Sequence, residues 1–167
     1  PLAMALLPGL YLSKKYGVVN LAKGLSLAHE VEANLEGEFR IMIQTILMAV
    51  YHENNNVEEK FYWLNKSAEA GDAQSQTILG IYLLTGNGIE KNTSDGMQLI
   101  TKVATNGGVD AQYFLGLLYY NGSQEVGLGR YIEADEKKAE YWLSMAIAQG
   151  DSRADEVLVV LNAELKV

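Results

Sequence analysis

The chain has 167 residues, of which 49% are hydrophobic and 20% are charged, a composition typical of one soluble folded body. Its 13 basic and 21 acidic residues give a net charge of -8, so nucleic acid is disfavoured as a ligand and a basic protein partner would be attracted. The absence of cysteine excludes disulfides, thiolate nucleophiles and cysteine metal sites.

The first third of the chain shows helical patterns with few sharp boundaries. Both prolines lie at or before position 8, so everything from Gly9 onward is free to be helical. A helix is expected to end at His52 and Glu53, before a run of three asparagines. No run of about 18 consecutive apolar residues occurs, so the sequence predicts no membrane span.

The middle of the chain predicts a pair of antiparallel helices. Asp72 is suited to cap the first helix, which we expect to stop at the turn Gly86-Asn87-Gly88 because glycine tolerates positive φ. Asn92 to Ser94 offers a second cap. Gly107 is expected to end the second helix, as Gly71 and Gly150 end theirs.

This pair is repeated along the chain. Gly71, Gly80 and Gly86 reappear as Gly107, Gly116 and Gly122, each 36 residues later. A fixed period of this size indicates stacked supersecondary units, which leave an exposed groove for another molecule. We therefore expect an all-α single domain, 1–167, with copies at about 1–34 (partial), 35–70, 71–106 and 107–149, and a C-terminal capping helix at 150–167.

Gly80 and Gly116 fall inside the first helices of their copies, where glycine costs about 1 kcal/mol relative to alanine. The repetition of this cost suggests that the missing side chain permits close approach of the paired helix. Leu99 and Trp142 are the bulky groups expected to fill that space, and a helix kink is the alternative.

Two features of the sequence follow Gly122, the glycine turn of the fourth copy. A seven-residue insertion falls in the 123–134 loop, and its Arg130 and Tyr131 are candidate partner contacts, the alternative being a turn without function. The last segment carries Val157, Leu158, Leu161 and Leu165 at helical spacing, which predicts a helix that covers the final copy.

The segment 107–116, followed by Tyr119, Gly122, Lys138-Ala139 and 142–150, resembles the Sel1-like repeat, a relative of the tetratricopeptide repeat. The resemblance is strong for 71–150 and weaker for 9–70, where Gln44 and Val50 replace expected glycines. It implies a right-handed α-solenoid of stacked antiparallel helix pairs, an α/α superhelix. Proteins of this family act mainly as adaptors in protein complexes, many of them bacterial, and some look like immunity proteins that neutralise secreted toxins. Bacterial cytoplasm and periplasm both remain compatible with the sequence, because a removed leader would leave no trace.

If the first helices bury the face of Ser75, Leu79 and Leu83, the opposite face points toward the concave surface. That reasoning selects a stripe of candidate residues that would contact a protein partner, either a toxin or a component of a larger complex. Packing in the core is the competing interpretation, and for Tyr113 it is the favoured one. The stripe comprises Arg40 (or Phe39), Thr45, Met48, Thr77, Ile81, Leu84, Tyr113, Leu117 and Tyr120.

Catalysis is the disfavoured hypothesis. His29 and His52 are the only imidazoles, neither lies in a recognised motif, and no HExxH spacing occurs. The sequence therefore predicts no catalytic residue, no metal site and no cofactor, with a hydrolase-type enzyme as the alternative. The leading hypothesis is a non-enzymatic interaction scaffold.

Overall fold

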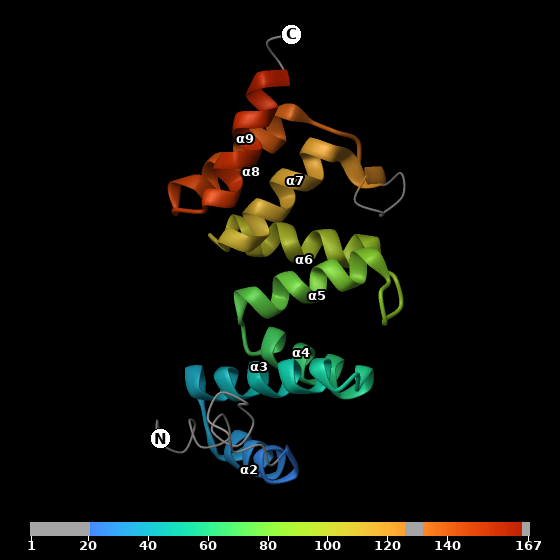
Figure 1. Ribbon diagram of the computed structural model, residues 1–167, viewed down its shortest axis with the longest axis vertical. Coiled ribbons are helices and arrows are strands. Elements are labelled where there is room, and N and C mark those ends of the chain that lie inside the picture. The colour runs from blue at the N-terminus through green and yellow to red at the C-terminus, as the bar shows by residue number, and fades with distance from the viewer. Residues whose placement is uncertain (1–20, 126–131, 165–167) are drawn as a thin grey trace. The chain divides into compact units, whose positions relative to one another are not determined.

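The computed structural model describes residues 21–125 and 132–164, and all regular structure in these residues is α-helical (Figure 1). The chain divides into two compact units, Pro1–Ser75 and Gln76–Val167, which are treated separately below. The helices are α2 (Leu21–Asn34), α3 (Gly37–Glu53), α4 (Val57–Glu69), α5 (Ala73–Thr85), α6 (Thr93–Thr105), α7 (Val109–Glu125), α8 (Glu136–Ala148) and α9 (Ser152–Glu164). Each of the predicted copies 35–70, 71–106 and 107–149 contains two of these helices. The single-domain organisation stays a prediction.

The helices α4, α6 and α8 each end just before one of the glycines that recur in the repeat. Gly71, Gly107 and Gly150 adopt φ values of 96°, 93° and 90°, which only glycine reaches without strain. The amide of the residue after each glycine donates to a carbonyl five residues back, closing the preceding helix. These bonds are Asp72 to Ser67 (3.2 Å), Gly108 to Val103 (2.9 Å) and Asp151 to Ala146 (3.1 Å).

The two predicted N-caps of the third copy are confirmed. The Asp72 carboxylate accepts from the Ser75 amide at 2.7 Å, at the start of α5. The Asn92 side chain accepts from the Asp95 amide at 3.1 Å, at the start of α6. Each bond satisfies one of the amides that a helix N-terminus leaves without a partner.

Close approach at the helical glycines is confirmed, but the side chains that fill the space differ from those expected. A methyl group on Gly80 would lie 2.5 Å from Ile100 Cγ1, and one on Gly116 would lie 2.6 Å from Leu143 Cγ. Ile100 and Leu143 therefore occupy the places expected for Leu99 and Trp142. The alternative of a kink at these glycines is not what the structure has: α7 departs from helical geometry at Gly122, with φ 71° and ψ 168°.

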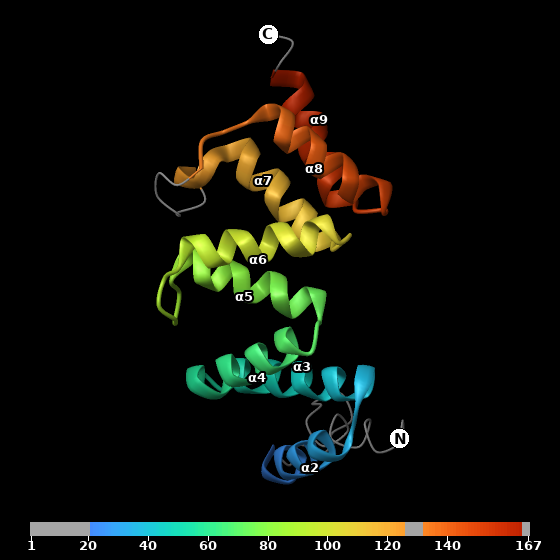
Figure 2. The ribbon, with the colours of Figure 1, turned by 180° about the vertical axis from the view of Figure 1, so that it is seen from behind.

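Each unit has its own apolar core. In the first unit α2, α3 and α4 enclose Ala28, Val31, Ile43, Leu47 and Trp63. In the second unit one core lies among α5, α6 and α7, where Leu84, Ile100, Val103, Leu115 and Leu118 are buried. Figures 1 and 2 show α5 and α6 side by side from both directions. This packing explains the stability of helices that are only 13 residues long.

The predicted capping helix is present as α9. Its Ala154 is buried together with Leu143 and Ala146 of α8, and Val157 and Leu158 pack on that cluster. Leu161 is 3% exposed. Leu165, the last apolar position of the predicted pattern, lies outside the described residues.

Candidate interaction surface

Within the second unit, the first helix of the third copy is covered by the second helix of the same copy. Helix α6 approaches α5 through Gly96, where a methyl group would lie 2.7 Å from the Gly80 carbonyl oxygen and 2.9 Å from Leu84 Cγ. At the start of α5, the Ser75 hydroxyl donates to the Ser67 hydroxyl at 2.9 Å within the first unit.

The contact with α6 overturns two of the predicted surface positions. Leu84 is 0% exposed and Thr77 is 3% exposed, so neither belongs to an open surface. The physical reason is the position of α6, which packs closely on the face of Gly80 and Leu84. Leu79 and Leu83, expected to be buried, are only half-buried.

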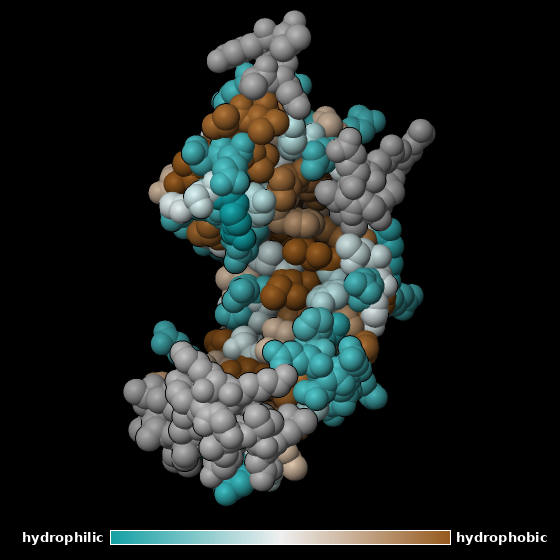
Figure 3. Space-filling model, viewed as in Figure 1, coloured by the Kyte–Doolittle hydropathy of each residue, from teal (hydrophilic) through white to brown (hydrophobic). Residues whose placement is uncertain are grey.

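Three predicted positions of the second unit remain partly open. Ile81 on α5 is half-buried and packs on the core, and its equivalent on α7, Leu117, is also half-buried. Tyr120 lies one turn beyond Leu117 and is half-buried as well. Figure 3 shows hydrophobic side chains gathered over α5 and α7 on this face. We call Ile81, Leu117 and Tyr120 the first-helix stripe.

Tyr113, another predicted position of this unit, has a partner within the chain. It packs on the core beneath α9, and the Arg153 guanidinium lies 4.5 Å from the centre of its ring. This geometry is a cation–π contact between α7 and α9. The favoured interpretation of Tyr113 as a packing residue therefore agrees with its surroundings.

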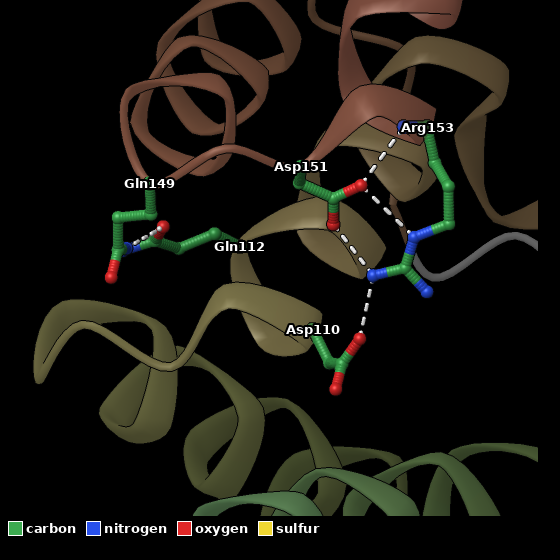
Figure 4. A network of polar contacts seen from close by, with 5 residues as sticks. All are labelled: Asp110, Gln112, Gln149, Asp151 and Arg153. Carbon is green, nitrogen blue, oxygen red and sulfur yellow. Dashed lines mark hydrogen bonds and ion pairs between the residues drawn. The ribbon is translucent and has the colours of Figure 1, made fainter.

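Arg153 belongs to a polar network between the starts of α7 and α9 (Figure 4). Its Nη2 donates to Asp151 Oδ2 and to Asp110 Oδ1, each at 2.6 Å, and its Nε donates to Asp151 Oδ1 at 3.0 Å. The Asp151 side chain is only 4% exposed. The hydrogen bonds from Arg153 hold the pKa of the Asp151 carboxyl below its usual value, and the same bonds raise the pKa of Arg153.

A second set of hydrogen bonds joins three helix ends, and Figure 4 shows its bond between Gln149 and Gln112. Gln149, at the end of α8, donates from Nε2 to Gln112 Oε1 at 2.8 Å. Gln112 is 0% exposed and donates in turn to the carbonyl of Ala104 on α6 at 3.0 Å. Both polar groups of this buried amide are therefore satisfied, which a buried glutamine requires. Gln112 has a structural role in the stacking of successive helices.

The predicted positions of the first unit also make contacts within the chain. Arg40 Nε lies 3.2 Å from Glu32 Oε1 on α2, and the same oxygen accepts from Gln44 Nε2 at 2.7 Å. The Thr45 hydroxyl donates to the Met42 carbonyl at 2.9 Å. Met48 is half-buried and packs on the core of the first unit.

Gln44 occupies the position at which the later copies carry Gly80 and Gly116. Its side chain is 3% exposed and its Oε1 has no hydrogen-bond partner. At this position the first unit therefore has a side chain that bonds to Glu32 on α2. Arg130 and Tyr131, the loop residues proposed from the sequence, lie outside the described residues.

Exposed apolar residues on the second helices were missed by the sequence reasoning. Tyr62 on α4 is 50% exposed and Tyr141 on α8 is 56% exposed. Both precede a tryptophan of the repeat, Trp63 and Trp142, and each makes an edge contact with it at a ring distance of 4.9 Å. The recurrence of this Tyr-Trp pair was the signal that could have identified them.

Shallow depressions lie on two of these second helices. One is lined by Lys137, Glu140, Tyr141, Ser144 and Met145 of α8. The other is lined by Leu83 of α5 with Asp95, Gln98, Leu99 and Lys102 of α6. Gln98 and Tyr141 are equivalent in the repeat, so the depressions mark the same face of successive second helices.

The His29 side chain is held by contacts with two aromatic side chains. Its Nε2 lies 3.1 Å from the Tyr51 hydroxyl, and its ring makes an edge contact with Trp63 at 5.1 Å. Burial raises the pKa of Tyr51, and the nearby Glu59 carboxylate adds to that effect. Among residues 21–125 and 132–164, no group of three or more His, Asp or Glu side chains is placed to hold a metal ion.

None of the helices that the structure describes is both long enough and apolar enough to cross a membrane.

Three successive segments, residues 61–72, 73–108 and 109–151, match the family model of the Sel1 repeat and together make up more than half of the chain. A crystal structure of a Sel1 repeat protein from Oxalobacter formigenes matches with a TM-score of 0.72 and 22% identity, over 93% of this chain and 61% of that one. A protective antigen of uropathogenic Escherichia coli strains, described as displaying an SLR fold, matches with a TM-score of 0.72 and 25% identity, over 96% of this chain and 33% of that one.

These likenesses identify the fold class as the one expected from the sequence, an all-α solenoid of stacked antiparallel helix pairs. The chain spans less than two thirds of the length of either protein.

Proposed function

Because this chain belongs to the Sel1 repeat family, we propose that it is a non-enzymatic scaffold that binds a protein partner. Proteins of this family are generally protein-interaction scaffolds. The observation that carries the proposal is the first-helix stripe of the second unit, where Leu117 and Tyr120 are half-buried on a helix whose neighbouring residues Leu115 and Leu118 are packed in the core. Tyrosine combines a large apolar ring with a hydroxyl and is enriched at the energetic centres of interfaces.

The chemistry of the partner follows from the charge of the chain. A net charge of -8 would steer a basic protein toward this surface and slow the approach of an acidic one. Within the class of scaffolds, the narrower proposal is an immunity protein that neutralises a basic secreted toxin. The alternative within the same class is an adaptor that forms part of a larger protein complex.

The test captures partners of the tagged full chain from its native host and identifies them by mass spectrometry, comparing two double variants. Leu117→Ala with Tyr120→Ala removes the part of the stripe that lies on α7, whereas Tyr141→Ala with Met145→Ala removes a tyrosine and an apolar side chain from the exposed face of α8. Loss of a hot spot costs about 2 kcal/mol or more, so we expect the first pair to weaken binding about 30-fold. The second pair should leave binding unchanged.

The nature of the captured protein separates the narrower proposals. A single tightly held toxin supports the immunity role, and a multi-protein assembly supports the adaptor role. If both variants retain the partner equally, with helicity preserved in circular dichroism, the first-helix stripe is not the surface that binds the partner.

A further inference from the structure

Asparagine is followed directly by glycine at three places in the chain. These pairs are Asn87-Gly88, Asn106-Gly107 and Asn121-Gly122. Asparagine is one of the thermolabile residues of proteins. It loses ammonia when the backbone nitrogen of the next residue attacks its side-chain amide carbon, and a glycine in that next position leaves the nitrogen open to approach because it carries no side chain. The sequence alone therefore offers three equivalent sites for this reaction.

The backbone decides whether the reaction can occur, because its intermediate is a five-membered ring. The ring closes only when the asparagine Cβ and the next backbone nitrogen are eclipsed about the Cα–C bond. At Asn106 ψ is 9°, which eclipses the Asn106 and Gly107 nitrogens instead and turns the Gly107 nitrogen away from the side chain. The Gly107 amide also donates to the Ala104 carbonyl at 3.1 Å. Asn106 is thus protected by the end of α6.

Asn121 is protected by α7. It lies inside this helix, and Gly122 is the residue of α7 that departs from helical geometry, so Asn121 itself keeps helical backbone angles. A helical ψ of about -42° does not eclipse Cβ with the next nitrogen. Gly122 is buried as well, which limits the access of water to this peptide bond.

The turn between α5 and α6 places no such restriction on Asn87. Asn87 and Gly88 are both exposed and lie outside the helices, and Gly88 has a φ of 82°. Within residues 21–125 and 132–164, no group accepts a hydrogen bond from the Gly88 amide. The Asn87 amide donates to the Thr85 hydroxyl at 3.4 Å, which is long for a hydrogen bond. The tip of this turn can therefore reach the eclipsed conformation without opening a helix.

From these contrasts we propose that Asn87 is a site of spontaneous covalent modification, at which the folded chain deamidates with water as the co-reactant. The Gly88 nitrogen bonds to Asn87 Cγ and the C–N bond of the side-chain amide breaks, so ammonia leaves with the proton of the Gly88 amide. Water then opens either C–N bond of the resulting succinimide, which gives aspartate or isoaspartate at this position. The site is separate from the first-helix stripe and does not depend on it.

The helix pair stays intact when the turn is modified. The Gly86 amide donates to the Tyr82 carbonyl at 2.8 Å, and the Asn92 amide donates to the Leu83 carbonyl at 2.8 Å, so both ends of the turn are held. Isoaspartate lengthens the main chain by one methylene between these two bonds. The product is therefore a folded chain with one more negative charge and a longer turn between α5 and α6.

Peptide mapping of the aged full chain tests this proposal. The chain is incubated at pH 8, either folded or in guanidinium chloride, then digested with trypsin and analysed by mass spectrometry with fragmentation that separates aspartate from isoaspartate. The tryptic peptide 67–91 contains Asn87 as its one asparagine, and the peptide 103–130 contains Asn106 and Asn121 as internal controls. The variant Asn87→Gln is the matched control for the turn, because its longer side chain would have to close a six-membered ring.

In the folded chain we expect Asn87 to deamidate about tenfold faster than Asn106 or Asn121, because the two controls require local opening of a helix first. In guanidinium chloride the three rates should become similar, and Asn87→Gln should leave position 87 unmodified under both conditions. Deamidation of Asn87 that is no faster than that of the controls in the folded chain would overturn the proposal. A product that contains aspartate without isoaspartate would overturn it as well, because a succinimide opens to both.

Discussion

Gly116 is the residue at which the packing of α7 on α8 depends most directly on a missing side chain. The distance of 2.6 Å from a built Cβ to Leu143 Cγ is shorter than real Cβ contacts allow, and the Leu143 backbone nitrogen is 3.3 Å away. A methyl group there cannot be accommodated by a side-chain rotation alone. The glycine thus sets the distance between the two helices.

Gly116→Ala is expected to lower the free energy of unfolding by about 1 kcal/mol. Overpacking costs about 1 to 3 kcal/mol and outweighs the gain of about 1 kcal/mol in helix propensity. Urea denaturation measures the change. In the double variant with Leu143→Ala the methyl group has room, so the two costs should not add. A single variant that is more stable than the wild type would contradict this account of the glycine.

At the scale of single residues, the sequence predicted which glycines allow close approach of a neighbouring helix, but not which side chains of that helix contact them. The repeated cost at Gly80 and Gly116 was enough to infer close approach. Ile100 and Leu143 were not identified as the contacting residues, because helical spacing fixes the rotation of a side chain about its own helix and not the axial position of the partner helix. The same limit explains Thr77 and Leu84, whose burial depends on where α6 lies.

At the scale of helices, the boundaries were predictable where a chemical signal marks them. Asp72, Asn92 and the glycines at 71, 107 and 150 lie at the predicted ends. Gly122, predicted as a turn residue, has a φ of 71° and interrupts α7 there, although the helix resumes as far as Glu125. The exposure of Val159 and Val160 on α9 was not predicted, because hydrophobic spacing indicates an apolar helix without indicating which of its faces is covered.

The junction between α7 and α9 is expected to be sensitive to acid. The pKa of Asp151 is depressed by Arg153, so the pair stabilises the fold above the usual carboxyl pKa of about 4, and this stabilisation is lost as pH falls through the depressed value. Asp151→Asn keeps a capping side chain but removes the charge. At pH 7 the variant should be less stable by about 1.5 to 3 kcal/mol, the range for a hydrogen bond to a charged group.

Urea denaturation at pH 7, 5, 4 and 3 follows the difference between the wild type and Asp151→Asn. We expect the difference to narrow steadily below pH 5. Asp110→Asn is the matched control, because the Asp110 side chain is 48% exposed and its contact with Arg153 is screened by water. A constant difference across the whole pH range would rule out the charged pair as its source.

At the scale of the whole molecule, the repeat period accounts for the fold because stability is divided among neighbouring helices. Each core described above is formed by helices adjacent in sequence, such as α5, α6 and α7. This distribution is typical of repeat proteins, whose stability is approximately a sum over repeats and the interfaces between neighbours. The identity of the proposed partner was not predictable, because the period is a property of packing and the proposed recognition surface consists of only a few side chains.

Deleting residues 151–167 tests the central claim, that the hairpins of this chain are stabilised by successive stacking. The deletion removes the buried Leu161 and Ala154 and uncovers Leu143 and Ala146 on α8. Burial of one leucine contributes about 1.5 to 3 kcal/mol, so differential scanning calorimetry should record a Tm lower by about 5 to 10 °C, together with aggregation. A soluble truncated chain that unfolds cooperatively at the Tm of the full chain would contradict the claim.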